Sequence, residues 1–201
     1  MNVIIIDYGA GNIQSIQFAL QRLGITAVLS NNPEVIQTAD KVIFPGVGEA
    51  SQAMQMLKHS KLDALIPSLK QEVLGICLGM QLLCKHSEEG DTKGLGVFDV
   101  NVKRFTNAVK VPHMGWNTIH NHSSGLLDKI PENSYMYSVH SYYAGLNEQT
   151  IASSNYEHEF SSALQSNNFY GVQFHPEKSS KDGSSIITKL FKLITCELYL
   201  Q

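Results

Sequence analysis

The 201-residue sequence lacks several features that would assign it to a specialised class of protein. No apolar run approaches the roughly 18 residues that a membrane span requires, and the first one, at residues 3–7, already ends in an acid. The 15 basic and 18 acidic residues are interspersed, for a net charge of -3, and form no basic stripe suited to the phosphates of a nucleic acid. We therefore expect a cytoplasmic protein that binds neither membrane nor nucleic acid.

Cysteine is scarce as well. Cys77, Cys84 and Cys196 form neither an even set nor a paired Cys-x-x-Cys, so the sequence indicates no disulfide framework and no zinc ribbon. We expect Cys84 and Cys196 to pack as small apolar residues. The His-Asn-His run at residues 120–122 alternates like a metal site, but further ligands are missing from its neighbourhood, so we expect a surface segment and assign no metal.

The first half of the chain alternates short β-branched runs with longer amphipathic segments, a pattern typical of parallel strands joined by helices. The expected buried strands are residues 3–7, 25–29, 42–44 and 73–76. The expected helices are residues 13–23, ending before Gly24, then residues 52–57 and 62–71.

After about Gly94 the pattern changes to the alternation of antiparallel strands. These strands are expected at residues 97–105, 135–142, 161–165 and 169–174, with a Ser-Asn-Asn turn joining the last two. A last helix at 184–200 would place Ile187, Leu190, Phe191 and Ile194 on one face. No repeat or linker is visible, so we predict a single domain over residues 1–201, of the α/β class, with a mixed, mostly parallel sheet and helices on both faces.

The strongest chemical signal is the pentapeptide GICLG at residues 75–79, which follows an expected strand and precedes an expected helix at 80–85. Glycine on both sides of Cys77 permits the sharp strand-to-helix turn that presents a nucleophile, and a helix N-terminus favours the thiolate. Taken alone, the pentapeptide is equally compatible with a tight turn around a buried structural cysteine.

A base for this thiol is found in the segment GVQFHPE at residues 171–177. His175 and Glu177 are two positions apart, and on an extended segment held by Pro176 they would point the same way. Glu177 would then orient His175, which would act on Cys77 as in other nucleophile–base pairs. A lone histidine at a strand end is commonly a surface residue, but the elbow cysteine favours the catalytic interpretation.

Acyl transfer also needs N–H donors for the developing oxyanion. The N–H of Leu78, next to the nucleophile, is one candidate, and the glycine-rich turn Gly46, Val47 and Gly48 is a second source. Taken in isolation, this turn is better explained as an ordinary strand-to-helix connection, but the elbow cysteine beside it favours the oxyanion interpretation.

Three motifs resemble those of the class I glutamine amidotransferases, in the same order and over nearly the whole chain. They are PGVG at 45–48, GICLGMQ at 75–81 and GVQFHPEKS at 171–179. Three more, DYGAGN at 7–12, VPHMGWN at 111–117 and YSVHSY at 137–142, are similar to the family members that act as separate subunits beside a cyclase in histidine biosynthesis.

The resemblance implies a three-layer fold with the site at the carboxyl edge of the sheet, and it implies glutamine hydrolysis without a cofactor. It implies Cys77 as nucleophile, His175 as general base and then acid, and Glu177 as its orienting partner. The oxyanion strand would lie at residues 46–48. The residues implied in holding glutamine are Gln81, His140, Ser141 and Tyr142.

The same resemblance implies a partner that receives the ammonia, a cyclase of the (β/α)8-barrel type, in a heterodimer. Candidates for the surface that meets it are Asn12, Tyr137 and Lys178. Trp116, the only tryptophan, is equally suited to the core and to anchoring a partner. His113, which has no carboxylate near it in sequence, is expected to be an interface or structural residue.

Two alternatives keep part of this interpretation. In the first, the ammonia serves another acceptor: the PHMGWN segment argues against pyridoxal phosphate, anthranilate and guanylate synthesis, but a paralogue for amidation of a surface sugar stays open. In the second, the chain is a catalytically silent partner, which the intact set of Cys77, His175 and Glu177 argues against.

Overall fold

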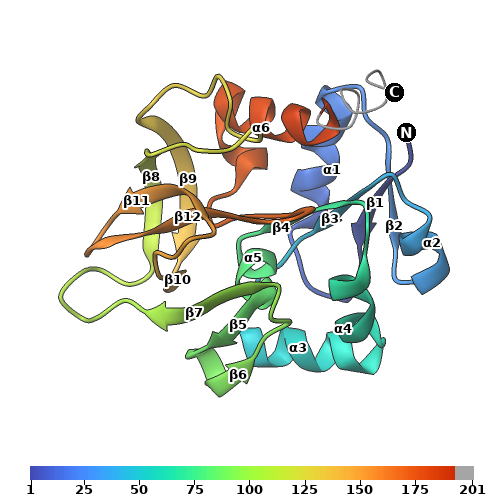
Figure 1. The fold of residues 1–201 in the computed structure, drawn as a ribbon, viewed down its shortest axis with the longest axis horizontal. Coiled ribbons are helices and arrows are strands. Elements are labelled where there is room, and N and C mark those ends of the chain that lie inside the picture. The colour runs from blue at the N-terminus through green and yellow to red at the C-terminus, as the bar shows by residue number, and fades with distance from the viewer. Residues whose placement is uncertain (193–201) are drawn as a thin grey trace.

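The computed structural model describes residues 1–192, and its framework is one large mixed sheet between two layers of helices (Figure 1). The strand order is β2-β1-β3-β4-β13-β12-β10-β7-β5-β6, with β11 beside β12 and a separate β8-β9 hairpin. The strands are β1 (Val3–Ile6), β2 (Ala27–Ser30), β3 (Lys41–Phe44), β4 (Glu72–Ile76), β5 (Cys84–Ser87), β6 (Thr92–Lys93), β7 (Phe98–Arg104), β8 (His113–Ile119), β9 (Ser134–His140), β10 (Tyr142–Ala144), β11 (Thr150–Asn155), β12 (Glu159–Ser166) and β13 (Phe169–Val172). The helices are α1 (Ile13–Arg22), α2 (Pro33–Gln37), α3 (Ala50–His59), α4 (Leu62–Leu65), α5 (Leu78–Leu83) and α6 (Ser180–Lys192), with 3-10 segments η1 (Ile66–Ser68), η2 (Glu89–Asp91) and η3 (Pro176–Lys178).

The strands from β2 to β13 along this order pair in parallel, and their side chains alternate between two cores. On β1, Val3 and Ile5 belong to the core beneath α1 and α6, whereas Ile4 and Ile6 belong to the core on the side of α2, α3 and α4. This alternation follows from the period of two along a strand. Loops after the carboxyl ends of β1, β3, β4 and β13 therefore gather at one edge of the sheet.

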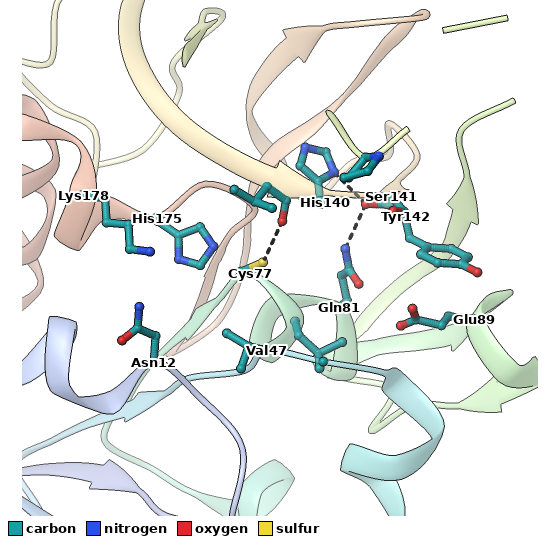
Figure 2. Close-up of a pocket in the computed structure, with 14 residues that line it drawn as sticks. Asn12, Val47, Cys77, Gln81, Glu89, His140, Ser141, Tyr142, His175 and Lys178 are labelled. Carbon is teal, nitrogen blue, oxygen red and sulfur yellow. Dashed lines mark hydrogen bonds between the residues drawn. The ribbon is translucent and has the colours of Figure 1, made fainter. Parts of the chain in front are cut away.

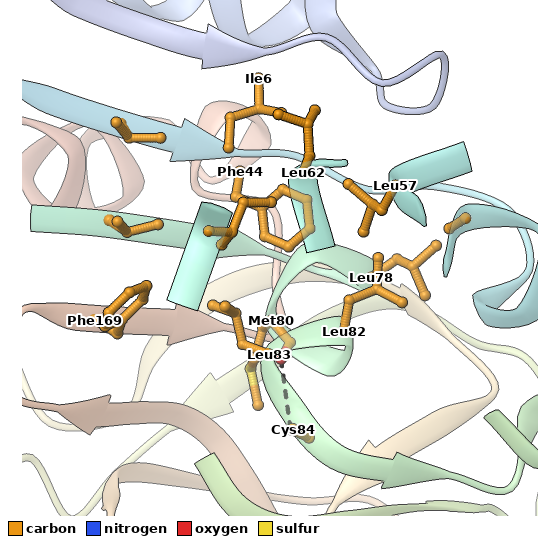
Figure 3. Packing of buried hydrophobic residues seen from close by; sticks show 14 of the residues in the cluster. Ile6, Phe44, Leu57, Leu62, Leu78, Met80, Leu82, Leu83, Cys84 and Phe169 are labelled. Carbon is orange, nitrogen blue, oxygen red and sulfur yellow. Dashed lines mark hydrogen bonds between the residues drawn. The ribbon is translucent and has the colours of Figure 1, made fainter. Parts of the chain in front are cut away.

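The core on the α3 side also anchors the elbow helix α5 (Figure 3). Phe44, Leu57 and Leu62 are fully buried there, and Leu78 and Met80 from α5 join the same cluster. Burying one such side chain stabilises a fold by about 1.5–3 kcal/mol, so this packing holds α5 and the turn before it in place.

The fold class predicted from sequence is confirmed: the sheet is mixed, with helices on both faces. The last helix begins at Ser180, before the predicted residue 184, and buries Ile187, Leu190 and Phe191. Its predicted extension to residue 200, and Ile194 with it, lies outside the described residues, as do Cys196 and the end of the predicted domain. None of the helices within residues 1–192 has the length and apolar character needed to span a bilayer.

The predicted helix at 62–71 is correct only over its first four residues, Leu62–Leu65. Helix α4 ends at Leu65, the 3-10 segment η1 follows, and Leu69 is already extended. Pro67 lies in η1 and has no N–H with which to continue a helix. The side chain of Asn168 donates to the carbonyls of Leu69 and Gln71, at 3.0 and 2.7 Å, which holds the segment extended up to β4.

Two further boundaries differ from the sequence prediction. Residues 25–29 were expected to form a buried strand, but β2 lies at the edge of the sheet and Val28 is 50% exposed. The helix expected at 80–85 begins at Leu78 and ends at Leu83, and Cys84 opens strand β5. Cys84 is therefore a buried strand residue and not part of a helix face.

The second half contains more strands than the alternation predicted. The expected strand at 135–142 is two strands, because β9 pairs with β8 whereas β10 pairs with β7 and β12, and the chain changes sheets at Ser141. Strands β8 and β11 were not predicted, and neither were β5 and β6, which precede Gly94. The hairpin expected between the last two strands is confirmed, with Ser166 paired to Phe169 across the turn.

Candidate active site

Cys77 occupies a strained turn between β4 and α5. Its backbone angles are φ 54° and ψ -111°, an unusual conformation for a residue with a side chain, and such strain costs on the order of 1–3 kcal/mol. Its N–H donates to the carbonyl of Val172 on β13 at 2.8 Å. A Cβ on Gly79 would collide with the carbonyl oxygen of Phe44, and one on Gly75 would lie 2.8 Å from Leu83 Cδ1. Both glycines are therefore required for the turn predicted from GICLG.

His175 and Glu177 lie beside this turn, and both are buried. The Nδ1–H of His175 donates to Glu177 Oε1 at 2.9 Å. The expectation of an extended segment here is wrong, because residues 176–178 form a 3-10 turn in which the N–H of Lys178 donates to the His175 carbonyl at 3.0 Å. Proline is well accommodated at the start of such a turn, so Glu177 folds back onto His175.

The electrostatics of His175 reflect its two partners. Burial lowers its pKa, but hydrogen bonding and charge attraction to Cys77 and Glu177 outweigh this and raise the pKa to about 10. A histidine beside these two partners is stabilised as the imidazolium. Because the Nδ1–H is committed to Glu177, the Nε2 atom is the one available to exchange a proton at Cys77.

A pocket of about 330 Å³ opens over Cys77 (Figure 2). Most of the residues proposed from sequence line it, although they come from five different parts of the chain. The residues that line it are Asn12, Val47, Gly48, Cys77, Leu78, Gln81, Glu89, Pro112, Val139, His140, Ser141, Tyr142, His175 and Lys178. Of the predicted residues, Gly46, Trp116, Tyr137 and Glu177 are outside this lining.

The proposed oxyanion donors lie on one side of Cys77. Leu78, Val47 and Gly48 line the pocket, while Gly46 packs behind them against the elbow, where an added Cβ would lie 2.5 Å from the Gly79 nitrogen. Among the described residues, the N–H groups of residues 46–48 donate to no other protein group. They are therefore available to a bound oxyanion.

The opposite wall is built around the carbonyl of Tyr142. It accepts hydrogen bonds from Gln81 Nε2 at 2.9 Å and from His140 Nδ1 at 2.7 Å. Gln81 Nε2 also donates to Gln173 Oε1 at 2.8 Å, so this side chain supports the wall. These contacts hold the segment from His140 to Tyr142 where the chain passes between sheets.

Three lining residues were not predicted from the sequence: Glu89, Pro112 and Val139. Glu89 is the most informative, because it places a carboxylate at the far end of the pocket from His175 (Figure 2). Burial raises its pKa, the N–H of Ala50 lowers it, and the nearby Glu49 raises it again. Its only sequence signal is the acidic run Glu88-Glu89 after the elbow, which resembles an ordinary solvated turn.

The four residues suggested for a partner surface fall into two groups. Asn12 and Lys178 line the pocket itself, and Lys178 Nζ lies 5.9 Å from the centre of the Tyr137 ring. The Tyr137 ring meets the Trp116 ring edge-on at 5.9 Å. Trp116 is 53% exposed, so the core alternative for it is wrong. Met114 on the same strand and Tyr135 on β9 are also exposed, at 63% and 62%, so the β8-β9 hairpin presents an apolar surface.

The remaining candidates have structural settings. His113 is buried, stacks on Tyr156 with ring centres 4.0 Å apart, and hydrogen-bonds His140 at 3.0 Å. Cys84 is fully buried, its thiol donates to the Met80 carbonyl, and burial raises its pKa. Within residues 1–192, no three His, Cys, Asp or Glu side chains are grouped as a metal site would require.

Comparison with known proteins shows the same family across almost the entire chain. Residues 4–194 match the family model "Glutamine amidotransferase class-I". The chain is 51% identical to the imidazole glycerol phosphate synthase subunit HisH of Bacteroides thetaiotaomicron and 52% identical to that of Bacteroides fragilis, in each case over 96% of this chain and 100% of the relative. It is 43% identical to HisH of Idiomarina loihiensis, over 98% of this chain and 100% of the relative.

Solved structures share the fold at much lower identity. A putative GMP synthase protein from Thermoplasma acidophilum superposes with a TM-score of 0.74 at 18% identity, covering 96% of this chain and 92% of that one. PurLQS from Thermotoga maritima superposes with a TM-score of 0.70 at 13% identity, covering 95% and 97%.

Proposed function

The chain belongs to the class I glutamine amidotransferases, and from this we propose that it is the glutaminase subunit of an imidazole glycerol phosphate synthase. The observation on which the proposal rests most heavily is that Cys77 and His175 line one pocket, while Glu177, outside the lining, hydrogen-bonds His175. A strained, buried cysteine next to an imidazolium and its orienting carboxylate suits nucleophilic attack on a carboxamide.

In the proposed reaction, the Cys77 thiolate attacks the carboxamide carbon of glutamine and forms a tetrahedral oxyanion. The N–H of Leu78 and one N–H from residues 46–48 stabilise this oxyanion. His175 donates its proton to the departing ammonia, which leaves a glutamyl thioester on Cys77. Water then attacks the thioester with His175 as general base, and glutamate is released.

The ends of the pocket suggest how glutamine is held. The carboxylate of Glu89 lines the end of the pocket opposite His175 and would bind the α-ammonium group of the substrate. The segment from His140 to Tyr142, held by Gln81, would supply backbone contacts to the rest of the substrate. No cofactor takes part in these steps.

The ammonia would pass to a cyclase of (β/α)8-barrel type in a cytoplasmic heterodimer, where it enters histidine biosynthesis. The exposed apolar side chains of the β8-β9 hairpin, Met114, Trp116 and Tyr135, support a docking surface next to the pocket, because contiguous apolar patches commonly mark protein interfaces. Tyr137, Lys178 and Asn12 would line the border between this surface and the pocket.

The test is the complex of this chain with its cyclase, assayed for synthesis from glutamine and separately from ammonia. Cys77→Ala and Cys77→Ser should abolish glutamine-dependent synthesis while ammonia-dependent synthesis persists, because the cyclase site is untouched. Cys84→Ala, at the other described cysteine, is the matched control and should retain both. Glutamine turnover that survives Cys77→Ala would exclude Cys77 as the nucleophile.

A further inference from the structure

Residues 45–48, which are Pro45 and the oxyanion strand at 46–48, have a fixed first half and an open second half. Gly46 is wedged against the elbow, where an added Cβ would lie 2.8 Å from Leu78 Cβ. Gly48, with φ +95°, has no atom within 4 Å of where its Cβ would be, and Val47 is 41% exposed. The contacts that hold the first half therefore determine the positions of the N–H groups of Val47 and Gly48 that follow it.

Two residues of the loop after β1 hold that first half through Pro45. The hydroxyl of Tyr8 donates to the Pro45 carbonyl at 2.9 Å, and only 6% of Tyr8 is exposed. The Tyr8 ring packs against Phe44, with centres 5.5 Å apart. Gly11 approaches the proline ring, since a Cβ there would lie 3.0 Å from Pro45 Cβ.

We propose that Tyr8 is a positioning residue for glutamine hydrolysis, acting through the Pro45 carbonyl to orient the oxyanion strand. The inference rests on the proposed function, because the strand has this role only if Cys77 attacks a carboxamide. The peptide unit is planar, so holding the Pro45 carbonyl also fixes the plane that contains the Gly46 nitrogen. Only the two backbone dihedrals of Gly46 then separate this fixed plane from the Val47 N–H.

The hydroxyl stays a donor over the working range of pH. A carbonyl oxygen can only accept, so the hydrogen of the 2.9 Å contact belongs to Tyr8. Burial, and then the charge of the nearby Cys77, raise the pKa of Tyr8 well above its ordinary value. Tyr8 is thus a neutral group that acts on geometry and takes no proton in the reaction.

The test uses Tyr8→Phe, which keeps the ring and removes only the hydroxyl, in the complex with the cyclase. Glutamine kcat should fall about tenfold, because a displaced oxyanion donor loses much of its contribution, while KM stays within about twofold. Alkylation of Cys77 by iodoacetamide occurs at a saturated carbon and forms no oxyanion. Its rate should therefore be unchanged, and a purely structural defect at the elbow would slow it together with kcat.

Tyr170→Phe is the matched control, since Tyr170 is 8% exposed and its hydroxyl bonds Gln165 toward the other end of β13. It should leave glutamine kcat unchanged. The proposal is overturned if Tyr8→Phe keeps kcat within twofold of the unmodified chain, or if alkylation slows in proportion to kcat. Failure of the proposed function would appear differently, as an unmodified complex that hydrolyses no glutamine, and the role of Tyr8 would fall with it.

Gly11→Ala provides an independent variant should Tyr8→Phe not fold. It leaves the hydroxyl in place and crowds the Pro45 ring, at a residue whose φ of +132° is unfavourable for alanine. The same pattern is expected: lower kcat with an unchanged rate of alkylation. Turnover within twofold of the unmodified chain would show that the position of Pro45 does not control the reaction.

Discussion

His175 and His140 line the same pocket and are buried to a similar degree, yet their surroundings favour opposite charge states. His175 contacts a cysteine and a carboxylate, and its pKa is raised to about 10 despite its burial. His140 donates from Nδ1 to the Tyr142 carbonyl and accepts at Nε2 from His113. Burial lowers the pKa of His140 to about 3; the Tyr142 carbonyl opposes this shift, and His113 and His175 add to it.

The difference shows that burial alone does not decide how a histidine functions. With a carboxylate at Nδ1, the ring can hold a positive charge and transfer protons at Nε2. With a carbonyl at Nδ1 and a neutral histidine at Nε2, the ring is held as one neutral tautomer. One histidine is thus suited to chemistry and the other to holding the wall of the pocket.

The largest effect should come from removing the charged histidine. His175→Ala should lower glutamine kcat on the order of 10⁵-fold. Glu177→Gln should lower it by only about 10³-fold, because the nucleophile and base remain in that variant. Single-turnover hydrolysis in the cyclase complex, with folding checked by circular dichroism, measures both. An equal loss in the two variants would mean that Glu177 does more than orient His175.

A smaller effect is expected at the neutral histidine. His140→Phe removes both hydrogen bonds that hold the pocket wall and should raise KM for glutamine about fivefold, which corresponds to about 1 kcal/mol. His140→Asn can retain a donor near the Nδ1 position and should lie closer to the unmodified chain. Steady-state kinetics decide: a loss in kcat as large as that of His175→Ala would remove the distinction between the two histidines.

The smallest effect should appear in the pH dependence of stability. The folded pKa of His175 lies above the ordinary 6.5, so its contribution is present below pH 6.5 and is lost as the pH rises to about 10. The folded pKa of His140 lies below 6.5, so its contribution is present above pH 6.5 and is lost as the pH falls toward 3. Other groups titrate too, so the free energy of unfolding is compared between the unmodified chain and each Asn variant.

Urea unfolding at pH 5, 7 and 9 measures this free energy. The difference in free energy of unfolding between the unmodified chain and His175→Asn should be smaller at pH 9 than at pH 7. The difference between the unmodified chain and His140→Asn should be smaller at pH 5 than at pH 7. Opposite trends would contradict the assigned charge states.

Local patterns predicted most of the parallel half of the fold, and they indicated Cys77 and His175, which line one pocket. Strands such as β3 were predictable because they are short β-branched runs buried on both faces. The elbow at GICLG was predictable because its turn requires glycine on both sides of Cys77. The antiparallel half was harder. Residues 134–144 alternate as one strand would, but pairing with two different partners divides them at Ser141.

The sequence by itself determined the chemistry available to this protein: a cysteine at a glycine-bounded elbow, a histidine and a glutamate two positions apart, and a glycine-rich strand to meet them. Such motifs are local, so spacing and residue type suffice to recognise them. Tertiary structure alone decided that Glu89 closes the pocket, that burial and His113 lower the pKa of His140, and that Tyr8 holds Pro45. The two hydrogen bonds join residues 27 or more positions apart, and the pocket is built from several segments of the chain. Only tertiary packing brings such residues within hydrogen-bond distance.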